Sequence, residues 1–364
     1  MAETSDNTGR PRLRTTTAAR RRLLPTIRRG WQLLWRPLGS LAVIGLLLWL
    51  VPLSEFRAVL AAIDPLLAAA SLGLVLPMAA TKAAIFWQAA KVQGLVFSFR
   101  QMLAIQLSAA FYTLVVPGQL GGTVARWYKL QKPGRQPVEA AAVMLMARLL
   151  ETGIACLLGL ALAMADPVAR SAGVLPILAI VFLAICGGSL LLVSTFGRRI
   201  GAALAARLPQ SRWLAPLQRT LPRLRDAARR ARRMPAGVIW RIILCSLLWN
   251  GLGILSIVLA AMAVGADVSW VTLGWMRSLL AVILLLPLGW GGLGVREAGV
   301  VAILQPYGVA PVLALAIGAI VSLRHILEAV LGGMVELIAL WRKKRGAEPP
   351  DTATAPLDRA GLAR

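Results

Sequence analysis

The chain has 364 residues, 58% of them hydrophobic, and a mean hydropathy of +0.72. This composition excludes an ordinary soluble domain, and the long apolar runs lack the period-two alternation of a membrane β-barrel. The net charge is +25, but the basic residues lie between apolar runs, where the positive-inside rule and anionic lipids account for them better than nucleic acid does.

Eight apolar segments follow one another along the chain, separated by polar or basic stretches. A membrane-spanning helix needs about 20 mostly apolar residues. The candidates are residues 38–53, 66–88, 100–116, 138–164, 174–195, 238–264, 271–288 and 309–341, and a short apolar piece at 295–305 follows the seventh. The sequence therefore predicts an all-α, polytopic helical membrane protein.

Two glycine-rich breaks interrupt these segments, and each is followed by arginine. The first, at residues 117–122, precedes Arg126, and the second, at residues 287–294, precedes Arg296 and Glu297. Backbone that leaves the helix at membrane depth is tolerated only where protein or a water-filled cavity covers it. A charge at that depth costs at least about 2.5–3.5 kcal/mol, so it usually has a function. The breaks are therefore the most informative features of the sequence.

The basic residues predict which loops face the cytoplasm. Residues 1–37 hold nine of them, residues 196–237 hold eleven arginines, and residues 342–345 are all basic. Three loops are sparse in basic residues and carry an acidic residue, namely 54–65, 165–173 and 265–270, whereas the 89–99 loop holds Lys91 and is followed by Arg100. If 100–131 and 271–305 are re-entrant hairpins, every basic segment falls on the cytoplasmic side. This predicts six full spans, two hairpins that enter from opposite faces as in inverted-topology repeats, and cytoplasmic termini. Eight full spans with another parity are the alternative.

The predicted organisation has three parts. Residues 1–37 form a basic cytoplasmic segment, residues 38–342 form the transmembrane domain, and residues 343–364 form a disordered cytoplasmic tail rich in Pro, Ala, Thr and Asp. The basic cytoplasmic loop at 196–237 is either a helix lying on anionic headgroups or a solvated loop.

Several charged residues fall inside the apolar segments. Arg148 and Glu151 are three residues apart, and Arg324 and Glu328 are four apart, so each pair is expected to meet along one helix face. Such pairs either hold helices together or belong to a site. Lys82 lies near the predicted cytoplasmic end of its span. Its side chain therefore either has a function inside the membrane or extends (snorkels) to the membrane surface.

The two breaks themselves predict an anion site. Arg296 and Glu297 are adjacent and cannot easily face each other on a helix, so each needs a partner elsewhere. Arg277 is expected near the outer end of its hairpin limb. Glycines allow close approach of backbone N–H groups, helix N-termini are positive, and arginine suits phosphate. The predicted substrate-binding residues are Gly121, Gly122, Arg126, Arg148, Glu151, Gly292, Gly294, Arg296 and Glu297. The expected ligand is an anionic phospholipid or polyprenyl-phosphate headgroup.

The sequence offers no catalytic constellation. His325 is the one histidine, and Cys156, Cys186 and Cys245 lie inside apolar runs without metal-ligand spacing. No P-loop or nucleophile elbow is present. We therefore expect no enzymatic activity, no metal and no cofactor.

Three motifs carry a resemblance to a known family. They are the glycine break ending in Arg126, the stretch 147–150 (Ala-Arg-Leu-Leu), and Gly292-Leu-Gly294-Val-Arg296-Glu297. Together they resemble the lysylphosphatidylglycerol synthase transmembrane-region family, also called the flippase-like or UPF0104 family, over about residues 38–342. The resemblance implies a stand-alone member without the synthase domain. Thr123 and Ala147 stand where the family often has acidic residues.

The residues and the resemblance together predict a multi-pass lipid transporter of the bacterial inner membrane, most simply a flippase. Arg126 and Arg296 would bind the headgroup phosphate, while Arg148, Glu151 and Glu297 would tune or gate the site. The alternatives are a non-catalytic accessory subunit working with lipid-biosynthesis enzymes in hopanoid, glycolipid or cell-wall lipid synthesis, an integral transferase acting on a lipid-linked substrate, and a membrane scaffold.

Overall fold

A computed structural model of the chain describes residues 53–116, 120–131, 137–171, 173–193, 230, 233–284 and 292–344. Throughout these ranges the regular structure is helical, without a strand. The predicted basic segment at 1–37, the first span at 38–53, the loop at 196–237 and the tail at 343–364 lie almost entirely outside the described residues.

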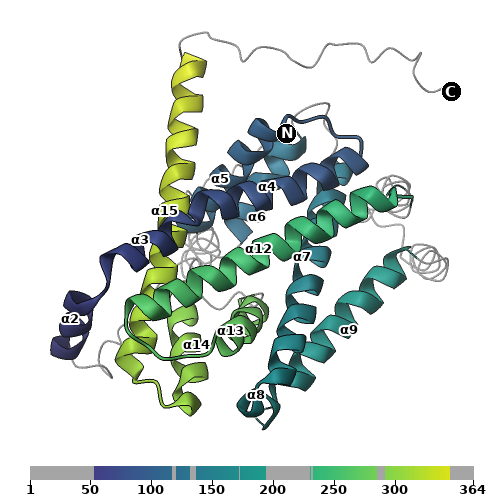
Figure 1. Cartoon of the computed structure of the whole chain (residues 1–364). Coiled ribbons are helices and arrows are strands. Elements are labelled where there is room, and N and C mark those ends of the chain that lie inside the picture. The colour runs from purple at the N-terminus through teal and green to yellow at the C-terminus, as the bar shows by residue number, and fades with distance from the viewer. Residues whose placement is uncertain are drawn as a thin grey trace, which may run out of the picture.

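The helices form one bundle, in which the long upright helix α15 lies at one side and α7 and α9 lie at the other (Figure 1). In chain order they are α2 (Leu53–Ala62), α3 (Pro65–Gly73), α4 (Val75–Val92), α5 (Phe99–Val115), α6 (Leu120–Gln131), α7 (Pro137–Ala165), α8 (Pro167–Ser171), α9 (Val174–Val193), α12 (Ala236–Ala263), α13 (Trp270–Ile283), α14 (Val295–Leu304), the 3₁₀ turn η1 (Gln305–Tyr307) and α15 (Pro311–Lys344).

Four stretches of helix are long and apolar enough to cross a membrane. They are Pro65–Val92, Pro137–Ala165, Ala236–Ala263 and Pro311–Arg342, so the predicted spans at 66–88, 138–164, 238–264 and 309–341 are present as helices. Shorter apolar helices cover Val174–Gly188 and Trp270–Ile283. The chain is thus a polytopic helical membrane protein.

The prediction of a loop at 54–65 is wrong for most of its length, because α2 occupies it. The sequence from Leu53 to Ala62 contains good helix formers and neither glycine nor proline. Asp64 then caps α3, where its side chain accepts hydrogen bonds from the backbone N–H groups of Leu66 and Leu67. The polar stretch therefore separates two helices without being a loop itself.

The helices α5 and α6 form a tight hairpin on either side of the first break. A Cβ at Gly121 would collide with the carbonyl oxygen of Tyr112, and one at Gly122 would collide with the side chain of Thr113. A Cβ at Gly332 of α15 would likewise collide with the carbonyl oxygen of Leu107 on α5. These glycines let helix backbones approach closely, as small residues do in membrane bundles.

The helices on either side of the second break are arranged differently. The two helices α13 and α14 contact each other little, since α13 packs mainly against α7 and α14 mainly against α15. At 14 and 10 residues, both are too short to cross a hydrocarbon core about 30 Å thick. The described parts of the predicted segment 271–305 are therefore two short helices, each of which packs mainly against a different long helix. Its re-entrant topology and that of 100–131 stay predictions.

A buried carboxylate fixes the ends of several helices. Asp166 follows α7 and is 5% exposed. Its Oδ2 accepts hydrogen bonds from the Oγ1 of Thr272 at 2.7 Å, the Nε1 of Trp275 at 2.9 Å and the hydroxyl of Tyr307 at 2.8 Å. Its Oδ1 accepts from two backbone N–H groups at the start of α8. One side chain thereby joins α7, α8, α13 and η1.

These contacts set the protonation of the cluster. Burial raises the pKa of Asp166, but the hydrogen bonds from Trp275, Thr272 and Tyr307 outweigh burial and leave the pKa below its ordinary value. Burial, followed by the hydrogen bond to this carboxylate, raises the pKa of Tyr307 to about 12. Both groups thus keep the charge states that the cluster needs at neutral pH.

We expect Asp166→Asn to lower the unfolding temperature of the detergent-purified protein by about 3–6 °C at pH 7, because the charge-assisted hydrogen bonds are lost. A carboxylate with a lowered folded pKa stabilises above its ordinary pKa near 3.9, and that stabilisation is lost as the pH falls through the folded pKa. The wild-type advantage should therefore shrink below about pH 4. Asp267→Asn, at an exposed position, is the control, and equal effects of the two variants would contradict the role of Asp166.

Candidate functional site

A cavity of about 660 Å³ lies inside the bundle and is lined by residues of α4, α5, α6, α7, α12, α13, α14 and α15. Its size falls in the range of small-molecule pockets. Both glycine breaks end at it. Leu114 and Gly122 line it from either side of the first break, and Leu284 and Leu293 from either side of the second. Segments far apart in the sequence thus meet at one site.

The charged side chains around this cavity are mostly basic. The basic ones are Lys82, Arg126, Arg148, Arg277, Arg296 and Arg324, and the acidic ones are Glu151 and Glu328. The lining therefore has an excess of four positive charges. The N-terminal turns of α6 and α14 also lie at the cavity, so their positive dipole ends add to this potential.

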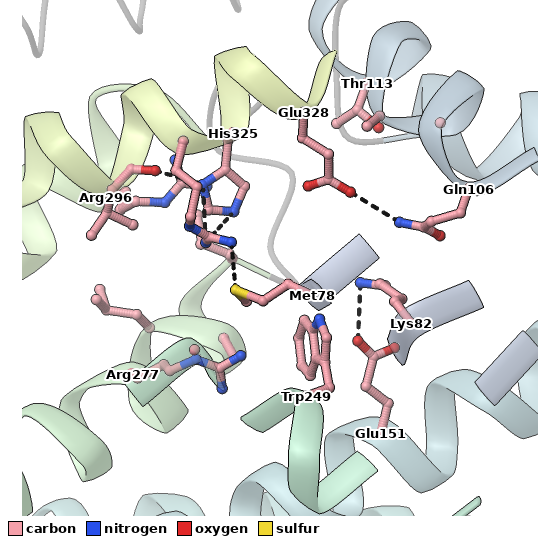
Figure 2. A pocket seen from close by; sticks show the side chains of 18 of the residues that line it. Met78, Lys82, Gln106, Thr113, Glu151, Trp249, Arg277, Arg296, His325 and Glu328 are labelled. Atoms are coloured by element: carbon pink, nitrogen blue, oxygen red, sulfur yellow. Dashed lines mark hydrogen bonds and ion pairs between the residues drawn. The ribbon is translucent and has the colours of Figure 1, made fainter. Parts of the chain in front are cut away.

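One carboxylate neutralises a lysine across the cavity. The Nζ of Lys82 lies 3.0 Å from the Oε1 of Glu151 and 4.5 Å from the ring centre of Trp249 (Figure 2). The predicted pairing of Glu151 with Arg148 on the same helix is therefore wrong, as is snorkelling of Lys82. Arg148 lines the cavity without an ion-pair partner among the described residues. Glu151 is 3% exposed, and its ion pair with Lys82 joins α7 to α4.

A glutamine joins the next two charged groups. The Nη2 of Arg126 donates to the Oε1 of Gln106 at 2.7 Å, and the Nε2 of Gln106 donates to the Oε1 of Glu328 at 3.2 Å. The Arg126 guanidinium also lies 4.3 Å from the ring centre of Phe86. The prediction that Glu328 pairs with Arg324 is therefore wrong. The glutamine instead links α6, α5 and α15.

Arg296 and Glu297 share a serine. The Nη1 of Arg296 donates to the Oγ of Ser322 at 3.0 Å, and Ser322 donates in turn to the Oε1 of Glu297. The other carboxylate oxygen of Glu297 accepts from the backbone N–H of Gly294 at 2.6 Å, which caps α14. The expectation that each residue has a partner other than its neighbour is confirmed. Glu297 itself stays behind the cavity wall.

The second break depends on glycine for its backbone. Gly292 has φ +82° and Gly294 has φ +81°, conformations that residues with a Cβ rarely adopt. This turn directs Arg296 from the first turn of α14 into the cavity. The glycines therefore position the arginine and do not themselves line the site.

Arg277 was expected near the outer end of its helix, but it lines the cavity. Its Nη1 donates to the Oδ1 of Asn250 at 2.6 Å, and its guanidinium lies 4.6 Å from the ring centre of Trp249. The side chain rests on Gly253 of α12, where a Cβ would collide with the guanidinium. Asn250 and Gly253 belong to another helix, α12, so the sequence around Arg277 gave no signal that they would meet it.

Arg324 also enters the cavity, beside the only histidine of the chain. Its Nη1 contacts the Sδ of Met78 at 2.9 Å, and its Nη2 lies 3.4 Å from the Nε2 of His325. The Nδ1 of His325 donates to the carbonyl oxygen of Val321 at 2.8 Å, which leaves Nε2 as the acceptor. The intramembrane position of Arg324 was the available signal, but its apparent partner on the same helix concealed its role.

The predicted site residues divide into two groups. Those that line the cavity are Gly122, Arg126, Arg148, Glu151 and Arg296, whereas Gly121, Gly292, Gly294 and Glu297 support its walls. The site prediction missed the remaining lining residues, which include Lys82, Gln106, Arg277, Arg324, His325 and Glu328. Within the described ranges, no group of three or more His, Cys, Asp or Glu side chains is arranged to hold a metal ion.

Apolar helices of membrane-spanning length around a mostly basic cavity define the chain as a polytopic helical membrane protein with a charged cavity inside its helix bundle. The family profile described as Lysylphosphatidylglycerol synthase TM region matches residues 38–333. The chain belongs to this family, and the match covers the transmembrane region alone. No curated protein and no solved structure gives a significant match to the chain.

The Lys82–Glu151 pair supplies a test of the site's internal electrostatics. We expect Glu151→Gln to destabilise the purified protein by about 2–4 kcal/mol, because it leaves a largely buried lysine uncompensated. Adding Lys82→Gln to that variant should restore at least half of the lost stability, since the charge and its partner are then both absent. Thermal unfolding of the two single variants and the double variant measures the coupling, and strictly additive losses would contradict the pairing.

Proposed function

We propose that this protein moves an anionic lipid, either a phospholipid or a polyprenyl-phosphate-linked lipid, between the leaflets of the bacterial inner membrane, without catalysing a chemical reaction. The observation that carries the proposal is the excess of four positive charges around a cavity inside an apolar bundle. Such an excess is costly in the membrane unless an anion balances it. Membership of the flippase-like family supports a lipid as that anion.

The location of the charges supports transport more than storage of a lipid. The headgroup site lies among helices of membrane length, so a bound headgroup would be held within the hydrocarbon layer while its acyl chains remain in lipid. Arg126 from α6 and Arg296 from α14 approach the cavity from the two different breaks. Each can offer the planar fork that phosphate accepts.

Reconstitution tests the proposal. Purified protein in phosphatidylcholine vesicles is supplied with a fluorescent anionic phospholipid, and a membrane-impermeant quencher measures how much of it changes leaflet. We expect movement well above that of protein-free vesicles, and a reduction of about tenfold in Arg126→Ala and in Arg296→Ala, because each loses a charge-assisted phosphate contact.

The matched control is Arg241→Ala, because Arg241 is an exposed arginine of α12 outside the cavity lining. This control should move lipid at the wild-type rate. Wild-type protein that leaves every anionic phospholipid and polyprenyl phosphate in its original leaflet would refute transport. Full activity in both cavity variants would refute the assigned site.

A further inference from the structure

The positive charges of the cavity are unevenly balanced. One part contains Lys82, Arg126 and Arg148 together with both carboxylates of the lining, Glu151 and Glu328. In the view of Figure 2, the labelled members of this part lie on one side of Trp249 and Met78, while Arg277, Arg296 and His325 lie on the other. The excess charge is therefore concentrated on the side formed by α13, α14 and α15.

Three arginines on that side, Arg277, Arg296 and Arg324, are hereafter called the arginine group. Every side chain that hydrogen-bonds to their guanidinium groups among the described residues is neutral. These acceptors are Asn250 for Arg277, Ser322 for Arg296, and Met78 and His325 for Arg324. The carboxylate of Glu297 reaches Arg296 through the hydroxyl of Ser322 and also caps α14.

Two members of the arginine group are buried, the third, Arg277, is half-buried, and all three carry the same charge. Arg296 is 7% exposed and Arg324 is 6% exposed, and like charges that line one cavity repel each other, although Glu297 offsets part of this repulsion at Arg296. Like the Nε of Arg126 on the other side of the cavity, the Nε of Arg324 is buried without a hydrogen-bond partner among the described residues. A charge-bearing donor that is buried and unpartnered is costly, so this side chain is suited to an anionic acceptor from outside the chain.

We infer that the arginine group is a subsite for a lipid headgroup whose phosphoryl part carries about two or more negative charges, namely a phosphomonoester or a diphosphate. This inference rests on the proposed function and narrows its substrate class. A phosphodiester brings one negative charge to three guanidinium groups. A phosphomonoester brings about −1.5 to −2 at pH 7 and three acceptor oxygens, which match the three arginine forks more closely.

The stability of the unliganded protein distinguishes a ligand site from a structural role of the arginines in helix packing. If the arginines hold helices together, removal of one lowers the unfolding temperature. If they form a vacant anion site, removal of one relieves repulsion between buried like charges, and the unliganded protein becomes more stable, as is common at binding sites. Arg277→Gln and Arg324→Gln therefore give opposite results under the two interpretations.

The binding experiment compares two lipids with identical acyl chains. Full-length protein in phosphatidylcholine nanodiscs is doped with phosphatidic acid, a phosphomonoester, or with phosphatidylglycerol, a phosphodiester, and native mass spectrometry measures the retained lipid. We expect at least about tenfold preference for phosphatidic acid. Arg277→Gln and Arg324→Gln should lose this preference and unfold a few degrees higher without lipid. Arg241→Gln should match wild type in both measurements.

A parallel experiment with soluble anions tests whether the phosphoryl group comes from a lipid or from a free anion. Inorganic phosphate or diphosphate that stabilises the lipid-free protein as strongly as phosphatidic acid would overturn a lipid site in favour of a free-anion site. Equal retention of the two lipids, or lower unfolding temperatures in both variants, would overturn the inference. Transport of phosphatidylglycerol at the rate of phosphatidic acid would refute this subsite while the proposed function survives. Preferential binding of phosphatidic acid without transport would refute transport alone.

Discussion

The cost of placing guanidinium groups inside an apolar helix bundle is the constraint to which the rest of this structure responds. An ion moved from water into a medium of low polarity loses far more hydration than a single neutral hydrogen bond restores. The chain meets this cost by placing six cations around one cavity and giving most of them a specific neighbour. Glu151 compensates Lys82, Gln106 joins Arg126 to Glu328, and Trp249 offers its ring to Lys82 and Arg277.

The two breaks make this collection of charges geometrically feasible. A continuous span would carry its charges at fixed positions along one axis, whereas the short helices α6 and α14 begin at the cavity and present their first turns to it. The walls depend on close backbone approach, since Gly121 and Gly122 allow α6 to lie against α5 and Gly332 allows α15 to do the same. Small residues thereby compensate for the absence of a hydrophobic driving force between helices in lipid.

The two sides of the cavity differ in how many carboxylates offset their positive charges, so they would bind an anionic headgroup with different strength. The acid-containing side already satisfies much of its charge internally, so a phosphate arriving there competes with Glu151 and Glu328. On the opposite side, the arginines donate directly to the neutral acceptors Ser322, Asn250 and Met78, and a carboxylate, that of Glu297, reaches Arg296 only through Ser322. A headgroup would therefore gain more from the second side, while the first side offers both donors and acceptors to any further polar group that it carries.

Local properties of the sequence were enough to predict the spans and the breaks. Hydropathy over about 20 residues identified α7, α12 and α15, and glycine-rich interruptions followed by arginine led to Arg126 and Arg296 as cavity residues. Helical spacing failed for charge pairing, because Glu151 pairs with Lys82 on another helix and Glu328 with Gln106. Spacing along one helix states only which side chains can meet. The tertiary packing decides which partner is nearer in a low-dielectric interior, where a buried charge is stabilised most by the group that the neighbouring helix brings to it.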